Sequence, residues 1–392
     1  VNKRITLCTI GCYKGRPQGL WAPASATFSG GVTVFPAGFS LTTTNDLTIT
    51  GNGGGFDLSN GVLVVGNTLT MDSPHLCNIT ANNGPDSKTV VKDLVVKQGE
   101  FHWYASATTT STLQVDNYCV VTNGGRLVLH SGPTNGLLPG YGACLNVARD
   151  VIVSGNGSWI HPMSDPVNGG SVFMQMRSLL ITTTNAGIDA TERGYGGGDW
   201  YGSRPAGVHP AGYGPGAGVN SGSGGYGGAG AVTNKAGGGT AGGTYGSMTV
   251  PLAPGGGGGG YGEFGGSGGG LVWIKASRTV SVNGAIRANS NTFKKSNAGA
   301  GGSGGGIYIR CRTLTGTSDG VIEAKGGHGR YDDDWSGAGG GGGRIAMWRT
   351  DDTYLGAYSV TNGTGYDAPR TGQPGTLYFG YVVRPGTLIL VQ

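Results

Sequence analysis

A short strand pattern recurs along most of this chain and limits the fold more than any other feature. The pattern has five positions: a polar residue, then Asp, Ser or Thr, then an aliphatic residue, then any residue, and usually a second aliphatic residue. Early copies begin at Asn45, Asn67 and Lys92, at intervals of 22 and 25 residues. Later copies begin at Ser111, Arg149, Arg177, Arg278 and, in weaker form, Arg312. Parallel β-solenoids have turns of roughly 20–30 residues, so the interval fits one turn of such a fold.

The later repeats contain two more strands in each turn. Alternating strands precede the pattern at 172–176, 272–276, 307–311 and, in shortened form, 345–348. Third strands follow it at 187–190, 285–288 and 321–324. Nine Asn-Gly pairs provide residues that tolerate the positive φ of tight corners. We therefore expect an all-β fold, a parallel β-solenoid (β-helix), and keep an antiparallel sandwich with accidental periodicity as the alternative.

Alternation along each strand separates a core face from an outward face. The expected core positions of the first strand are Val172, Val272, Ile307 and Ile345, with Met174, Ile274, Ile309 and Met347. On its outward face, Phe173, Trp273 and Tyr308 should form one column, and Gln175, Lys275 and Arg310 the next. The third strand places Asp189, Arg287 and Glu323 outward, with alternating charge. Such cross-strand charge pairs stabilise a sheet by about 0.2–1 kcal/mol each.

Glycine is the second feature to explain, since 84 of 392 residues are Gly, against a usual share of about 7%. Residues 194–270 alone hold 34 glycines in 77 positions. This segment and two shorter ones, 299–306 and 337–343, all leave the solenoid after a third strand, so they should lie side by side. Extended three-residue-per-turn helices direct their backbone polar groups sideways, and chains without side chains can approach closely enough to hydrogen-bond. We expect such a bundle, with 255–260 bonded to other glycine segments; loops fixed only at their ends are the alternative.

These segments divide the chain into four parts. Solenoid turns occupy 1–190, the long glycine-rich insertion 191–270, and further turns with shorter excursions 271–350. The C-terminal part, 351–392, has strand character and could pair with a neighbouring subunit.

The units GGSGGGLVWIKASRTVSVNGAIRANS and GGSGGGIYIRCRTLTGTSDGVIEAKGG, followed by GAGGGGGRIAMW, resemble glycine-rich β-helical surface proteins of bacteria. The glycine block separately resembles the polyglycine-II bundles of phage tail-fibre adhesins, springtail antifreeze proteins and anaplastic-lymphoma-type receptor kinases. The first resemblance covers about 169–350 and rests on the repeat pattern rather than on a catalytic motif. It implies an exported, surface or extracellular protein and no activity.

Residue types that carry chemistry are sparse. The six histidines show no HExxH motif and no spaced pair, which favours surface or turn positions. Asp332, Asp333 and Asp334 could hold Ca²⁺, although a solvated loop is favoured because the EF-hand spacing is missing. An even number of cysteines permits disulfides, for which the candidates are Cys8, Cys12, Cys77, Cys119 and Cys144. We expect no cofactor apart from this possible calcium.

Composition limits the partners and the location. Charged residues make up 12% of the chain and the net charge is +5, without the Lys/Arg cluster that nucleic acid needs. No apolar run is long enough to span a membrane. The first residue is Val1 rather than Met, which fits a processed N-terminus. The low charge and three Asn-X-Ser/Thr sequons (Asn78, Asn156, Asn362) fit an extracellular chain.

Three functions are compatible with these features. The first is a non-catalytic structural subunit that assembles head-to-tail with copies of itself into an extracellular filament, sheath or surface layer. The second is a surface adhesin that binds glycans or cells through exposed aromatic side chains. The third is a polysaccharide-active enzyme, for which Asp189, Arg287 and Glu323 are the nearest candidates, although a structural charge ladder explains them more simply.

Overall fold

The fold of this protein is all-β. The computed structural model describes residues 19–80, 88–108, 110–133, 140–198, 211–232, 239–260, 264–290, 299–329, 337–365 and 370–383. In these ranges no α-helix is present, and each ladder between two named strands is parallel. Parallel ladders contradict the antiparallel sandwich that the sequence left open.

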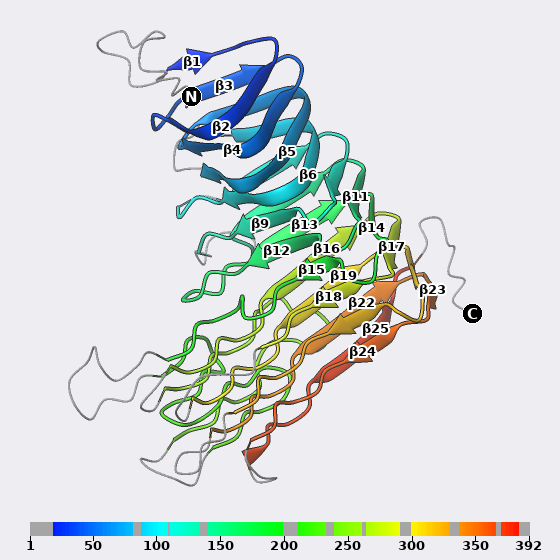
Figure 1. Cartoon of the computed structure of the whole chain (residues 1–392). Coiled ribbons are helices and arrows are strands. Elements are labelled where there is room, and N and C mark those ends of the chain that lie inside the picture. The colour runs from blue at the N-terminus through cyan, green and yellow to red at the C-terminus, as the bar shows by residue number, and fades with distance from the viewer. Residues whose placement is uncertain are drawn as a thin grey trace, which may run out of the picture.

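The strands stack in three columns, which the chain visits in the same order from the N-terminal end of the stack to the other (Figure 1). The first column contains β1 (Leu20–Trp21), β3 (Ser40–Thr43), β7 (Ser111–Val115), β10 (Ala143–Val147), β13 (Val172–Met176), β16 (Leu271–Ala276), β19 (Gly306–Arg310), β22 (Arg344–Arg349) and β25 (Thr376–Tyr381). The second contains β8 (Cys119–Val121), β11 (Asp150–Val153), β14 (Ser178–Ile181), β17 (Thr279–Val282), β20 (Thr313–Gly316) and β23 (Asp351–Tyr354). The third contains β9 (Arg126–His130), β12 (Trp159–Met163), β15 (Gly187–Asp189), β18 (Ala285–Arg287), β21 (Val321–Glu323) and β24 (Ala357–Ser359).

Four long strands near the N-terminus continue from one column into the next. β2 (Ala26–Phe35) and β4 (Leu47–Ser59) each serve the second and third columns. β5 (Val62–Thr80) and β6 (Lys88–Tyr104) serve all three. Register shifts within these strands mark the places where they turn the corners.

The hydrophobic core runs between the columns along the whole stack. The eight core positions expected for the first strand of the later turns are all buried, which confirms the alternation. The same pattern holds in the second column, where Leu179, Val280 and Leu314 are register partners and fully buried. Aliphatic side chains therefore stack on like neighbours at every turn, which removes apolar surface from water continuously along the axis.

Asn-Gly pairs form corners where the sequence predicts them. Asn123 has a φ of 52° and Gly124 a φ of 84°. Asn60, before Gly61, has a φ of 56°. Asn tolerates this left-handed conformation better than most residues because its short side chain can bond locally.

The two ends of the stack differ. At the N-terminal end four aromatic side chains pack in series, with ring centroids 6.2 Å apart for Trp21–Phe28, 5.9 Å for Phe28–Phe35 and 4.8 Å for Phe35–Phe39. At the other end, Leu377 and Phe379 of β25 occupy core-facing positions opposite Ile345 and Met347. They are 39% and 43% exposed, whereas Ile345 and Met347 are 0% and 1% exposed. The last core layer is therefore uncovered by the described residues.

The stack does not end at residue 350. β23 and β24 complete another turn, and β25 begins the next. Between β24 and β25, the described residues 360–365 and 370–375 belong to a fourth excursion from the corner that the earlier ones use. The segment 351–392 is thus, as far as it is described, a continuation of the stack rather than a separate strand element. The segments 1–18 and 384–392 lie outside the described residues.

Candidate functional site

The glycine-rich excursions lie beside one another and extend away from the third column (Figure 1). The glycine run 255–260 is hydrogen-bonded sideways to other segments of the long excursion and to the next excursion. The Gly255 N–H donates to Gly269 O (2.8 Å), and the Gly258 N–H donates to Gly266 O (2.8 Å). Gly256 O accepts from the Ser303 N–H of the next excursion (2.9 Å). The lateral bonding predicted for this run is therefore present, and the alternative of loops fixed only at their ends does not hold for it.

The same bonding links the return legs of successive turns. The Gly266 N–H donates to Ala300 O (2.8 Å), and the Gly269 N–H donates to Ser303 O (2.9 Å). One turn further, the Gly304 N–H donates to Gly341 O (2.9 Å). Backbone groups that loops usually expose to water are paired here, so the block is an ordered part of the fold.

Close approach explains why glycine occupies these positions. A Cβ placed on Gly257 would lie 2.0 Å from Gly196 O, and one on Gly265 would lie 1.9 Å from Gly258 O. A Cβ on Gly340 would lie 2.0 Å from Gly302 O. No side chain fits at such distances, so the segments hydrogen-bond and pack only because the side chains are missing.

A buried arginine fastens the long excursion to the strand stack. Arg344 of β22 is 7% exposed. Its guanidinium donates to Tyr245 O (3.0 Å), to Tyr226 O (3.2 Å) and to the Thr376 hydroxyl (3.1 Å). It also lies over the Tyr226 ring, 5.4 Å from the centroid. Four residues along β22, the Trp348 indole N–H donates to Thr249 O (2.7 Å).

The outward face of the first column carries the aromatic stripe that the sequence predicts. Phe173, Trp273 and Tyr308 are register partners and half-buried. The ring centroids of Phe173 and Trp273 lie 4.7 Å apart, and Tyr141 packs on both rings. On the same strands, two residues further along, Gln175, Lys275 and Arg310 form a second row of outward side chains and are exposed.

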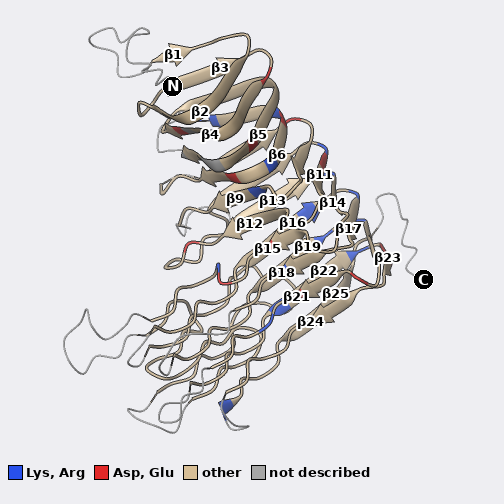
Figure 2. Cartoon of the chain, viewed as in Figure 1, with Lys and Arg blue, Asp and Glu red and all other residues tan. Residues whose placement is uncertain are grey.

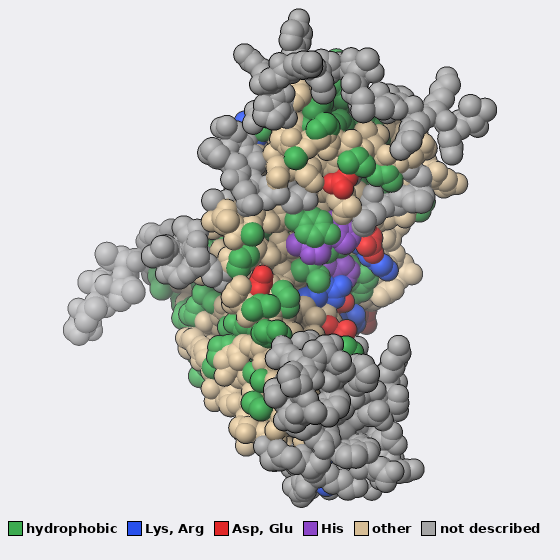
Figure 3. Space-filling model, turned by 90° about the vertical axis from the view of Figure 1, so that its left-hand side faces the viewer, with side chains coloured by type: hydrophobic (Ala, Val, Ile, Leu, Met, Phe, Trp, Pro, Cys, Tyr) green, Lys and Arg blue, Asp and Glu red, His purple; other side chains and the backbone are tan. Residues whose placement is uncertain are grey.

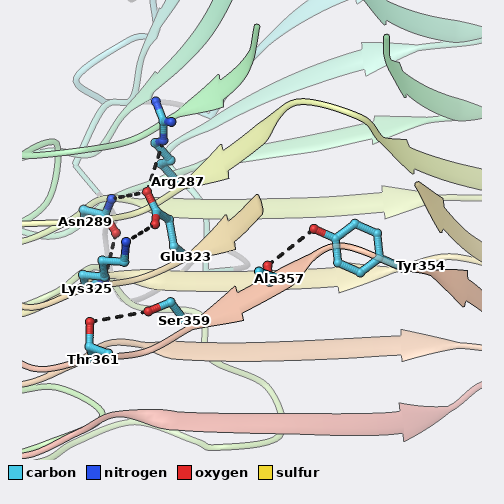
Figure 4. Close-up of polar contacts among 8 residues, drawn as sticks. All are labelled: Arg287, Asn289, Glu323, Lys325, Tyr354, Ala357, Ser359 and Thr361. Carbon is cyan, nitrogen blue, oxygen red and sulfur yellow. Dashed lines mark hydrogen bonds and ion pairs between the residues drawn. The ribbon is translucent and has the colours of Figure 1, made fainter. Parts of the chain in front are cut away.

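The outward column of the third strand holds Asp189, Arg287 and Glu323 as register partners. Arg287 Nε donates to Glu323 Oε1 (3.2 Å), Asn289 donates to the same oxygen (2.9 Å), and Lys325 pairs with Glu323 Oε2 (Figure 4). These donors hold the pKa of Glu323 below its usual value, although burial, the largest effect, opposes them. Asp189 instead accepts a hydrogen bond from the Thr191 N–H (2.9 Å). The charged side chains therefore form an Arg287–Glu323–Lys325 cluster. Lys325 was not among the residues predicted from the sequence.

Three histidines that are far apart in the sequence, His102, His130 and His161, lie together on the outward face of the third column (Figure 3). His102 Nδ1 lies 2.9 Å from His130 Nε2, and His102 Nε2 lies 2.9 Å from Glu100 Oε2. Tyr104 stacks on His130, with ring centroids 3.9 Å apart. On β12, His161 Nδ1 lies 2.8 Å from Asp189 O. The register of β6 and β9, which opposes Tyr104 to His130, is the signal that could have found this cluster.

Burial decides the ionisation of this cluster. Desolvation lowers the pKa of His130 to about 4, helped by the nearby His102 and Arg193. Desolvation likewise lowers the pKa of His161 to about 4. The hydrogen bond from His102 lowers the pKa of Glu100, and Arg126 contributes in the same direction. The His130 and His161 imidazoles are therefore neutral, and the Glu100 carboxylate is ionised, near neutral pH.

The disulfide prediction is wrong for two of its five candidates. Cys119 and Cys144 are free and buried. Desolvation raises their thiol pKa values to about 12 and about 11, which favours the unreactive protonated form. Cys77 is buried in the core, and Cys8 and Cys12 lie outside the described residues.

The calcium candidates Asp332, Asp333 and Asp334 also lie outside the described residues. Within the described part of the chain, no three His, Cys, Asp or Glu side chains are grouped to hold a metal ion. That part also contains no helix with the length and hydropathy of a membrane span. No family model, curated protein or solved structure matches this chain.

Proposed function

We propose that this protein is a structural subunit that assembles head-to-tail with copies of itself into an extracellular filament, sheath or surface layer. We interpret the three-column stack as a parallel β-solenoid and the glycine block as a polyglycine-II-like bundle attached to its side. Together they make a stiff rod with a hydrogen-bonded flank. The low charge of the chain and the nearly charge-free glycine block (Figure 2) suit a structural role.

The observation that carries the proposal is the last core layer at the C-terminal end of the stack, which none of the described residues covers. Leu377 and Phe379 occupy core-facing positions yet remain 39% and 43% exposed. Nearby Leu355 and Tyr381 are 75% and 62% exposed. An open parallel edge with apolar side chains favours pairing with another strand, because its backbone groups and its core side chains both lack a cover.

The opposite end offers a surface of matching design. It presents strands of the same three columns, in β1 and β2, whose outward faces carry Leu20, Val32 and Val34, exposed at 67%, 60% and 69%. Because the two ends differ, their contact is heterologous. A heterologous contact that does not close into a ring generates a filament.

The proposal is tested by placing charges on the uncovered layer. We expect Leu377→Glu/Phe379→Glu to abolish assembly, because burying two unpaired carboxylates at the contact is unfavourable. Met248→Glu/Val250→Glu is the matched control, since both residues are exposed and belong to the glycine-rich excursion. Electron microscopy should show filaments for the wild type and the control but not for the end variant. Filaments of normal length from a folded end variant would contradict the proposal.

A second function, adhesion to glycans, is favoured by the half-buried aromatic stripe of Phe173, Trp273 and Tyr308. Rings that present an apolar face beside polar groups suit sugars, which also carry both kinds of surface. Glycan binding by a protein that stays monomeric would favour this second function over assembly.

The polysaccharide-active enzyme has less support. Glu323, one of its candidate carboxylates, is held by Arg287, Asn289 and Lys325.

A further inference from the structure

One corner of the stack carries a row of exposed cationic side chains. At this corner, between the first and second columns, the Arg177 N–H donates to Arg149 O, the Arg278 N–H to Arg177 O, and the Arg312 N–H to Arg278 O, at 2.8 to 2.9 Å. Beside them on the first column, Lys275 and Arg310 are register partners. Figure 2 shows Lys and Arg positions following one another along this edge, next to β14, β17 and β22. We call Lys275, Arg278, Arg310 and Arg312 the basic edge.

The basic edge is unusual for this protein because its charges have no counterions among the described residues. All four side chains are exposed, and among the described residues none of them forms an ion pair. Cations elsewhere on the stack are neutralised by the neighbouring turn, as Arg177 is by Asp150 and Arg126 by Glu100. Like charges on adjacent strands destabilise a sheet. Two such pairs in succession, Lys275 with Arg310 and Arg278 with Arg312, therefore oppose folding unless an anion lies over them.

A groove lies beside these charges. It has a volume of about 580 Å³, and Lys275, Arg310 and Arg312 line it together with Cys311, Thr350 and Val382. The Thr350 N–H donates to Arg312 O (2.9 Å) and its hydroxyl to Val382 O (2.7 Å), so the groove continues along the same corner into the next turns. The groove therefore combines cationic groups with a hydroxyl and apolar surface.

We propose that the basic edge and its groove bind a linear acidic polysaccharide along the axis of the stack. Neighbouring turns are separated by about 4.7–4.9 Å, so the cations recur at that interval. A polysaccharide with one carboxylate or sulfate on each sugar carries anions at a comparable regular spacing. The aromatic stripe lies on the same strands, two residues before Lys275 and Arg310, where it can contact the apolar faces of the sugar rings. The binding does not depend on assembly, because one subunit contains all of these residues.

The ring arrangement favours a polysaccharide over single-stranded nucleic acid. Proteins that bind nucleic acid strands present separate ring faces on which successive bases stack. Here the rings pack on one another instead, tilted by 48° for Phe173–Trp273 and nearly perpendicular, at 75°, for Tyr141–Trp273. They form a continuous apolar strip rather than separate platforms.

The test compares polymers that differ in charge. Immobilised full-length protein is exposed to dextran sulfate, to uncharged dextran of equal length, to polygalacturonate and to single-stranded DNA, and binding is measured by surface plasmon resonance. We expect one or both acidic polysaccharides to bind, dextran not to bind, and affinity to fall as salt rises from 50 to 500 mM (about 14 to 4 Å of screening length). The variant Lys275→Gln/Arg310→Gln/Arg312→Gln should bind at least about tenfold more weakly, because three charge-assisted contacts are lost.

The control variant Lys88→Gln/Lys97→Gln/Arg126→Gln removes the same charge from other parts of the stack and should bind like the wild type. Thermal unfolding of both variants checks that they fold. If both variants bind acidic polysaccharide equally weakly, net charge alone explains the binding, and the proposal is overturned. Failure of both acidic polysaccharides to bind, equal binding of dextran, or tighter binding of DNA would overturn it as well.

Discussion

At the scale of single residues, glycine in this protein serves close approach between backbones. Gly257, Gly265 and Gly340 each lie where an added Cβ would overlap a neighbouring carbonyl oxygen. Ordering glycine costs more backbone entropy than ordering any other residue. The interlocking hydrogen bonds and tight packing of neighbouring segments offset this cost. The glycine content is thus a packing requirement rather than a sign of disorder.

A pair of alanine substitutions tests this interpretation. Gly257→Ala should destabilise the protein by about 1–3 kcal/mol or more, because the new methyl group forces neighbouring backbones apart. Gly243→Ala is the matched control, since an added Cβ there meets nothing within 4 Å. The control should be neutral or stabilise by about 0.4–1 kcal/mol through the unfolded state. The denaturant midpoints of both variants measure the difference, and similar midpoints would refute close packing at Gly257.

The histidine cluster makes stability depend on pH. The pKa of His130 is about 4 in the folded protein, below the value of 6.5 for an unperturbed histidine. The unfolded chain therefore binds more protons between pH 6.5 and pH 4. Stability should be fully present above pH 6.5 and decrease as the pH falls through that window. His161 acts in the same direction.

Melting temperatures between pH 4 and pH 7.5 check this dependence. His130→Gln should flatten the curve, because the substituted side chain cannot take up a proton. Other groups at the cluster, Glu100, Arg126, Asp189 and Arg193, remain unchanged in this variant. A variant with the full slope of the wild type would show that His130 does not cause the dependence.

At the scale of elements, Arg344 joins the long excursion to the strand stack. We expect Arg344→Met to destabilise the protein by about 2–5 kcal/mol, because the carbonyl groups of Tyr226 and Tyr245 lose their buried donor. Hydrogen exchange should accelerate in residues 239–260, while the core of β13 stays protected. Arg278→Met, at an exposed position, should leave exchange unchanged. Uniform protection in the Arg344 variant would mean that the glycine block holds itself in place.

The strand elements could be predicted from the sequence because their signal is local. Alternation in 172–176, 272–276 and 307–311 was enough to assign the core face and to place Phe173, Trp273 and Tyr308 in one column. Contacts that depend on the third dimension could not be predicted in this way. Arg344 reaches partners 99 and 118 residues away, through an excursion without periodicity. The fourth excursion, 360–375, was missed because it contains few consecutive glycines.

At the scale of the whole molecule, the stack is a rod whose two ends differ. The aromatic series of Trp21, Phe28, Phe35 and Phe39 packs into the core at one end, whereas at the other end no described residue covers Leu377 and Phe379. Every turn in between buries its aliphatic side chains against the turns on both sides. A further copy placed on the uncovered layer would extend this arrangement without a new kind of contact.

The most direct test of this account is a helical reconstruction, by electron microscopy, of the particles that the protein forms at high concentration. The second column alone has ten rungs in the described residues, from β2, β4, β5, β6, β8, β11, β14, β17, β20 and β23. At about 4.8 Å for each rung, a subunit should add roughly 48 Å or more to the filament. We expect filaments with that axial rise, with strands perpendicular to the axis and with Leu377 and Phe379 buried at the contact between subunits. Monodisperse monomers at the same concentration would contradict this account.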